Sequence, residues 1–159
     1  MRRVFGWLLA MALIGVAAPA SADITGFLGS NTTPASRPIK GVAFGSGILV
    51  LGFEFEYAST DQDVPKRAPS NKSGMGNVLL QTPVAILRLQ PYFTTGGGVY
   101  RERLESRQHT GFGLNTGGGV KISLAGPVRL RLDYRVFKLG SDALYSPTHR
   151  FYAGINLKF

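Results

Sequence analysis

The sequence predicts an all-β protein, an eight-stranded antiparallel up-and-down transmembrane β-barrel. Three observations predict this fold. Apolar and polar residues alternate along most of the chain, short turns alternate with long polar loops, and an apolar N-terminal segment of the export type precedes the alternating region. A chain of 159 residues is long enough for one such domain.

The N-terminus has the three parts of an export signal. Arg2 and Arg3 supply a positive start, residues 4–18 are apolar, and the segment ends with small residues at Ala20-Ser21-Ala22. The apolar run is short for a membrane helix, which needs about 20 residues. We therefore expect residues 1–22 to be a cleaved signal peptide and residues 23–159 to form one barrel domain. An uncleaved helical anchor is the alternative.

Alternation with a period of two predicts the strands. In "LVLGFEFEY" (49–57) the odd positions after Leu49 carry leucine, phenylalanine and tyrosine, and the even positions carry valine, glycine and glutamate. "VRLRLDYRVF" (128–137) alternates in the same way, which is the pattern of a strand whose two faces meet different surroundings. The predicted strands are 23–31, 39–46, 48–58, 75–84, 91–101, 110–124, 128–138 and 149–159.

The connections between these strands alternate in length. Segments 34–38, 59–74, 102–109 and 139–148 are polar, charged or rich in proline, whereas the breaks at 46–47, within 83–91 and at 125–127 are short. This rhythm predicts a meander with its long loops at one end. An even number of strands also allows both termini of a closed barrel to lie on the same side.

The two faces of the predicted strands indicate which side meets lipid. The apolar faces are nearly unbroken on four strands, while the opposite faces combine glycine with charges of both signs. A soluble sheet exposes its polar face, whereas a membrane barrel turns it toward a narrow lumen in which charges must pair. We therefore expect a lumenal charge network made of Glu54, Glu56, Arg129, Arg131, Asp133 and Arg135.

Two glycine triplets, residues 96–98 and 117–119, need an explanation. A hairpin centred near residue 107 would place them roughly opposite each other, where they would leave room for lumenal side chains or ease curvature. A phosphate-binding glycine loop would open a helix, and nothing helical follows either triplet.

The segments "GGGVKISLAGPVRLRLDYRVFKL" (117–139) and "YAGINLKF" (152–159) carry a resemblance to a known family. They resemble the small eight-stranded outer-membrane β-barrels, which include the OmpA transmembrane domain, OmpX and opacity-like proteins, and the likeness extends over residues 23–159. Gly154, Leu157 and Phe159 match the signal read by the barrel-assembly machinery, although Tyr152 stands where a polar residue is usual. We expect no peptidoglycan-binding domain after Phe159.

The resemblance implies a location and partners. It implies the outer membrane of a Gram-negative-type bacterium, with membrane lipids, lipopolysaccharide and the barrel-assembly machinery as partners and a monomeric state. The chain is basic, with 18 Lys+Arg against 9 Asp+Glu. We expect Lys66, Arg67 and Lys72 to contact lipopolysaccharide phosphates from a long loop. A nucleic-acid partner is not expected for an exported barrel.

The sequence offers little for catalysis. It contains no cysteine and only two histidines, His109 and His149, so we expect no cofactor and no metal site. Some barrels of the resembled family modify lipid A, and His149 has Ser141, Asp142 and Ser146 nearby in the sequence. We interpret these three as turn residues.

We therefore expect a non-enzymatic barrel with a structural or surface-interaction role, namely envelope integrity, adhesion or loop-mediated binding, and with a lumen plugged by paired charges. Three alternatives remain: a small channel, a lipid A-modifying enzyme, and a soluble lipocalin-like binder.

Overall fold

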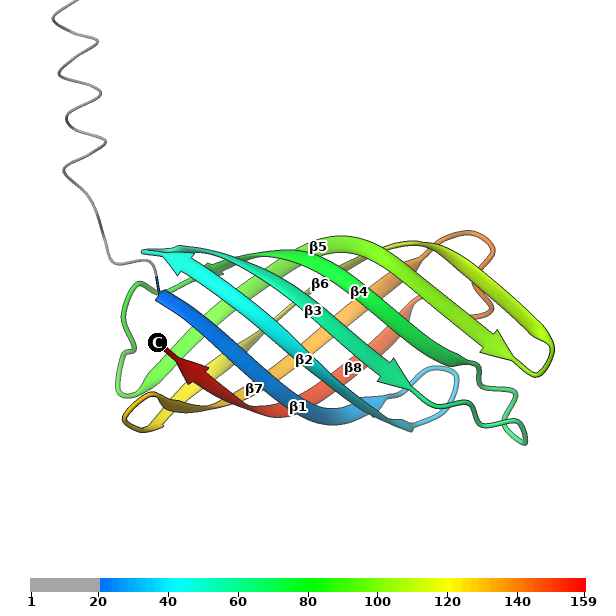
Figure 1. Cartoon of the computed structure of the whole chain (residues 1–159), viewed down its shortest axis with the longest axis horizontal. Helices are drawn as coiled ribbons and strands as arrows, with labels where there is room; N and C mark the ends of the chain where they lie inside the picture. Colours follow the sequence, from blue (N-terminus) through cyan, green and yellow to red (C-terminus); the bar gives the residue numbers. More distant parts are fainter. Residues whose placement is uncertain (1–20) are drawn as a thin grey trace, which may run out of the picture.

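The computed structural model describes residues 21–159, which form a closed antiparallel barrel of eight strands (Figure 1). No helix in this part of the chain is long and apolar enough to cross a membrane. Residues 1–20 of the predicted signal peptide lie outside the described residues. The strands are β1 (Ser21–Asn31), β2 (Arg37–Ile48), β3 (Leu51–Thr60), β4 (Ser70–Gln81), β5 (Leu89–Leu104), β6 (Arg107–Ala125), β7 (Val128–Leu139) and β8 (Thr148–Lys158).

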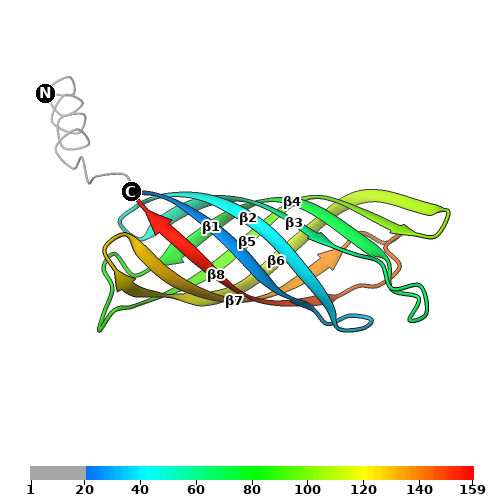
Figure 2. The same cartoon turned by 60° about the horizontal axis from the view of Figure 1, so that its bottom comes forward.

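Each strand pairs with its neighbour in sequence, and β8 returns to pair with β1, so the sheet has no free edge. Figures 1 and 2 show both ends of the described chain at the same end of the barrel as the β2–β3, β4–β5 and β6–β7 connections, of which the first and the last are two-residue turns. We name this the short-turn end and the opposite one the long-loop end.

Just past the last β1–β8 pairs, the Ala22 and Phe159 backbones exchange two hydrogen bonds of 2.9 Å. Cleavage after Ala22 would remove this contact.

The sheet closes with a stagger. The row of paired residues that leaves Leu28 through β2 reaches β6 at Thr110, whereas the row that leaves it through β8 reaches β6 at Val120. A stagger of this kind requires the strands to tilt by about 35–45° against the barrel axis. A row of paired residues therefore climbs toward the long-loop end as it passes from β1 to β6.

All eight predicted strands are present, and four predicted connections are wrong in detail. The predicted loop 34–38 lies at 32–36, because β2 begins at Arg37. The predicted break at 46–47 is a turn at Leu49 and Val50, and the predicted loop 59–74 is reduced to 61–69 because β4 begins at Ser70. The predicted loop 102–109 is mostly strand, and only Glu105 and Ser106 separate β5 from β6. The charged residues of this segment predicted a loop. They lie in strands instead, because this hairpin extends beyond its neighbours at the long-loop end (Figures 1 and 2).

The short β5–β6 turn also changes the expected pairing of the glycine triplets. They do not lie opposite each other, since Gly97 pairs with Leu114 and Gly118 pairs with Phe93. The second triplet does make room for lumenal side chains, because a Cβ at Gly119 would lie 2.6 Å from the Tyr92 hydroxyl. The inward-facing glycines of the second triplet thus serve close approach inside the barrel.

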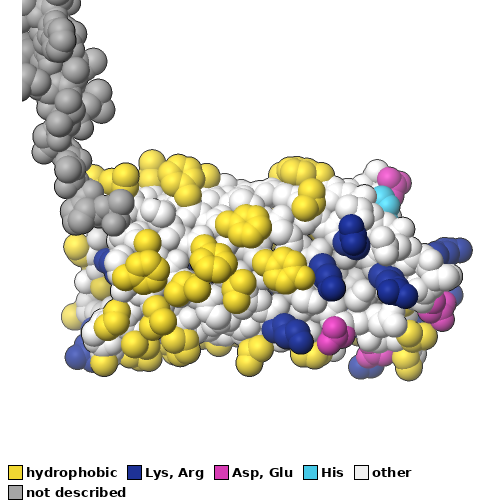
Figure 3. Space-filling model, in the orientation of Figure 1, with side chains coloured by type: hydrophobic (Ala, Val, Ile, Leu, Met, Phe, Trp, Pro, Cys, Tyr) yellow, Lys and Arg dark blue, Asp and Glu magenta, His cyan; other side chains and the backbone are white. Residues whose placement is uncertain are grey.

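Apolar side chains face outward and charged ones face inward. Phe53 and Phe55 of β3 are 64% and 56% exposed, whereas the intervening Glu54 is 4% exposed. Figure 3 shows the resulting apolar belt on one face of the barrel, ending before the long-loop end, where basic side chains gather. This distribution is the inverse of that in a water-soluble barrel.

Gly98→Ala tests the role of close approach. A Cβ at Gly98 would collide with the carbonyl oxygen of Gly74, whereas a Cβ at the outward-facing Gly76 would lie 3.9 Å from its nearest neighbour. We expect Gly98→Ala to lower the free energy of unfolding by about 1–3 kcal/mol. The matched control Gly76→Ala should leave it unchanged or raise it by about 0.4–1 kcal/mol. Denaturant unfolding in lipid vesicles measures both values, and equal losses would contradict this interpretation.

Candidate functional site

The lumen contains a layer of fully buried charges near its centre. Glu54 and Glu56 reach it from β3, and Arg131, Asp133 and Arg135 reach it from β7. Alternate residues of a strand point to the same face, so each strand delivers its charges in a column. The structure thus brings together five of the six residues predicted for the lumenal charge network.

Arg131 and Glu54 form a bidentate ion pair. The Arg131 Nη1 atom contacts Glu54 Oε2, and its Nη2 atom lies 3.2 Å from Glu54 Oε1 and 3.1 Å from Asp133 Oδ2. The remaining nitrogen, Nε, donates to the Tyr92 hydroxyl at 2.8 Å. Paired geometry of this kind gives the strongest charge-assisted hydrogen bonds.

Arg135 joins all three carboxylates of the layer. Its Nη2 atom lies 2.8 Å from Glu54 Oε1, its Nε atom 2.9 Å from Asp133 Oδ1, and its Nη1 atom 3.3 Å from Glu56 Oε2. Arg150 of β8 completes the layer with a 2.7 Å contact to Glu56 Oε1. Three guanidinium groups therefore face three carboxylates, and the layer is electrically balanced.

Arg129, the sixth predicted residue, belongs to a second cluster at the short-turn end. Its Nη2 atom lies 3.1 Å from Asp23 Oδ2, which Lys121 also contacts at 2.7 Å. Gln90 and Asn156 accept further hydrogen bonds from Arg129 at 2.9 and 2.7 Å. The charges thus form two layers along the barrel axis instead of a single network.

These layers fill the lumen. Arg131 and Arg135 are completely buried, and an eight-stranded barrel has an interior just wide enough for side chains. A cavity of about 220 Å³ at the short-turn end is lined by Asp23, Lys121 and Arg129 and reaches Glu54. Because buried charges are costly unless paired and hydrogen-bonded, this arrangement favours a rigid plug over an open path.

Two lumenal tyrosines were missed from the sequence. Tyr152 stacks on Phe27 with 4.1 Å between ring centroids, and its hydroxyl donates to Glu56 and accepts from Arg135. Tyr92 donates to Asp133. The inward position of Tyr152 could have been predicted, because Tyr152 lies on the same strand face as Arg150. Tyr92 gave no such signal, since no charged residue in its own strand marks the inward face near it.

The predicted alternative of a catalytic histidine does not assemble. His149 Nδ1 lies 2.7 Å from the Tyr134 hydroxyl, while the Ser146 hydroxyl bonds to the Leu139 backbone at 3.1 and 3.4 Å. His109 stands opposite Glu102 on the β5–β6 hairpin. Within residues 21–159, no group of three or more histidine, aspartate or glutamate side chains is arranged to hold a metal ion.

Two buried residues tie down the loops at the long-loop end. Arg37 donates to the carbonyl oxygens of Thr33 at 3.3 Å and of Pro69, so it links the β1–β2 and β3–β4 loops. Glu102 accepts from the Leu144 backbone N–H at 3.1 Å and so holds the β7–β8 loop. Sequence reasoning missed both residues because it placed them in or beside loops.

The residues predicted to contact lipopolysaccharide are not in one place. Lys66 and Arg67 lie in the β3–β4 loop, where Lys66 pairs with Asp63 at 3.2 Å. Lys72 instead lies on β4 and points outward from the barrel wall, because that strand begins earlier than predicted.

The residues predicted as an assembly signal lie on β8 and just after it. Gly154 faces inward, where a Cβ would lie 2.8 Å from the Cβ of Phe27, while Leu157 and Phe159 face outward. Gly154 thus has a packing role as well as a match to the signal.

No protein-family model matches the sequence, and neither does any curated protein. Solved structures do match. The N-terminal β-barrel domain of Pseudomonas aeruginosa OprF superposes with a TM-score of 0.70 at 14% identity, over 87% of this chain and 97% of that domain. The chain has the fold of the small eight-stranded outer-membrane β-barrels.

Two further structures show the same fold. Neisserial surface protein A has a TM-score of 0.66 at 19% identity, with 88% of this chain and 96% of that chain covered. The outer-membrane enzyme PagL has a TM-score of 0.55 at 12% identity, with 85% and 98% covered. The fold therefore occurs in an enzyme as well as in other barrels, and it does not decide on catalysis.

Arg135→Met tests the contribution of the central layer to stability. The change leaves the Glu54, Glu56 and Asp133 carboxylates with fewer partners inside the barrel. Breaking a buried ion pair costs about 3–5 kcal/mol, so we expect a loss of that size in the free energy of unfolding. Arg107→Met, at the exposed hairpin tip, is the control and should change it by less than about 0.5 kcal/mol. A loss for Arg135→Met no larger than for the control would show that the layer contributes little.

Proposed function

We propose that this protein is an outer-membrane β-barrel of a Gram-negative-type bacterium with a structural or surface-interaction role and without catalytic activity. The observation that carries the proposal is the inverted distribution of side chains, with phenylalanine and leucine on the outside of a closed sheet and paired charges within it. In water such an apolar surface would cause the protein to aggregate, whereas lipid acyl chains solvate the surface.

The alternatives fit the geometry less well. A soluble lipocalin-like binder needs an apolar cavity, and this lumen is charged and filled. A channel needs a continuous path, and the buried side chains of Arg131, Arg135 and Glu54 in the middle of the lumen favour a plug instead. A lipid A-modifying enzyme needs an activated nucleophile, and His149 is engaged with Tyr134 instead of a serine.

The long-loop end supports a role at the cell surface. Arg37 and Glu102 hold three of the four connections at this end against the barrel, so the loops present a defined surface. Envelope integrity requires only the barrel, whereas adhesion or ligand binding would use this surface. We further propose that Gly154, Leu157 and Phe159 are read by the barrel-assembly machinery and that residues 1–22 direct export.

Fractionation followed by gel electrophoresis tests the proposed location and fold. We expect the full chain, expressed in a Gram-negative host, to sediment with outer membranes and to migrate faster unboiled than boiled, because a closed barrel resists detergent unfolding. A variant that lacks residues 150–159 cannot close β8 onto β1 and should lose the fast-migrating form. Protein that stays soluble without detergent, with no change on boiling, would refute the proposal.

A further inference from the structure

The outer wall of the barrel has a groove that crosses the apolar belt from β7 to β4. Its volume is about 1100 Å³, and it is open to the outside along the barrel wall. Small outward-facing residues, Gly26 and Ala153, form its floor between larger apolar neighbours. A Cβ placed on Gly26 would meet no atom within 4 Å, so the space above this glycine is open. We name this feature the outer groove.

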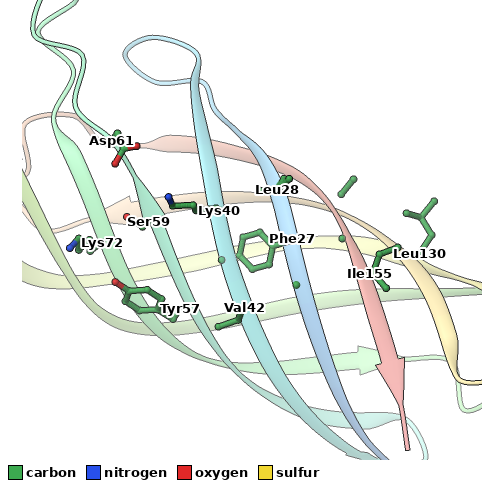
Figure 4. A pocket seen from close by; sticks show the side chains of 14 residues that line it. Phe27, Leu28, Lys40, Val42, Tyr57, Ser59, Asp61, Lys72, Leu130 and Ile155 are labelled. Carbon is green, nitrogen blue, oxygen red and sulfur yellow. The ribbon is translucent and has the colours of Figure 1, made fainter.

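One end of the outer groove is basic. Figure 4 shows Lys40, Ser59 and Lys72 together at one end, with Leu28, Ile155 and Leu130 toward the other. Lys40, Ser59 and Lys72 occupy one row of paired residues on β2, β3 and β4, and Tyr57 lies one outward position nearer the centre of the belt. The groove is therefore amphipathic along its length.

A second hollow continues the groove toward the long-loop end. Its volume is about 470 Å³, and it shares Ser59, Asp61 and Lys72 with the outer groove. Arg101 and Arg103 of β5 line its far side. We name this hollow the basic pocket. Figure 3 shows basic side chains gathered at this edge of the apolar belt.

The cations around the basic pocket outnumber the acidic groups beside them and form no ion pair with the described part of the protein. Lys72 and Arg101 stand directly opposite each other on β4 and β5, an arrangement of like charges that destabilises a sheet. Within residues 21–159 no ion pair involves Lys40, Lys72, Arg101 or Arg103. Asp61 also lines both hollows and offsets one of these four charges. The excess positive charge favours the binding of an anion from outside the protein.

We propose that the outer groove and the basic pocket together bind one phosphorylated lipid of the lipid A class. An acyl chain lies along Gly26 between Leu28 and Val42, and a phosphate group lies between Lys72 and Arg101. This proposal rests on the proposed outer-membrane location. It places the lipid contacts on the barrel wall and assigns Lys66 and Arg67 no part in them.

A lipid fits this composite site better than a soluble anion does. The apolar part and the basic part are continuous, and the apolar part opens outward within the belt, where only acyl chains are available to fill it. The basic part lies at the edge of the belt, where lipid head groups begin. A free phosphate would leave the outer groove empty.

Native mass spectrometry of the full chain, purified from membranes in mild detergent and stripped of lipid, tests the proposal. Diphosphoryl lipid A is the probe, and the same lipid without its phosphates and inorganic phosphate are the comparisons. We expect K40Q/K72Q to weaken binding of diphosphoryl lipid A roughly thirtyfold, from the usual contribution of two basic residues at a membrane surface. G26L should fill the groove and weaken binding roughly tenfold, the contribution of about two methylene contacts.

The matched control is K138Q, which removes an outward-facing lysine of β7 that lines neither hollow. It should leave lipid binding unchanged. Each of four results would overturn the proposal: equal binding of the phosphate-free lipid, displacement of lipid A by millimolar inorganic phosphate, no effect of G26L, or an equal effect of K138Q. Gel mobility of every unboiled variant verifies folding. If the proposed location is wrong, the protein will be soluble without detergent before any lipid is added. If the protein folds as a barrel in detergent but does not bind lipid A, only this site is refuted.

Discussion

The structure depends on the pairing of three arginines with three carboxylates inside a cylinder whose middle is filled by side chains. Arg131, Arg135 and Arg150 meet Glu54, Glu56 and Asp133 in one layer between β3, β7 and β8. If one partner were missing, a charge would remain buried at a cost of several kcal/mol. The layer therefore requires a closed barrel in one register, because a shift of one residue would turn these charges toward the apolar outside.

The crowded lumen also explains several of the glycines. Bulky lumenal side chains such as Tyr92, Arg135 and Phe27 need space that an ordinary strand residue would occupy. Gly119 lies against Tyr92, Gly117 against Arg135 and Gly154 against Phe27. The glycines and the large polar side chains are thus two parts of one packing arrangement. Outward-facing Gly26 is different, since nothing in residues 21–159 occupies the space above it.

Much of the fold could be predicted because alternation in strands such as β3 and β7 is nearly perfect. Five central charges were found for the same reason, since they lie in "FEFEY" and "RLRLDYR". The β5–β6 hairpin was misjudged because, beyond the apolar belt, both of its faces are polar and alternation disappears. The outer groove was invisible in the sequence. It depends on the registers of the β1–β2, β2–β3 and β3–β4 pairings, which bring Gly26, Lys40 and Lys72 together, and the predicted turns were not placed accurately enough to give those registers.

Quenching of tryptophan fluorescence by brominated lipids most directly tests which face of the sheet meets lipid. The sequence contains one tryptophan, Trp7, in the predicted signal peptide, so a single tryptophan can be introduced into the barrel. Phe93 faces outward and the adjacent Tyr92 faces the lumen at nearly the same depth. In vesicles of bromine-labelled phosphatidylcholine, strong quenching of F93W and weak quenching of Y92W is the predicted result. Equal quenching of the two variants, or stronger quenching of Y92W, would contradict the account.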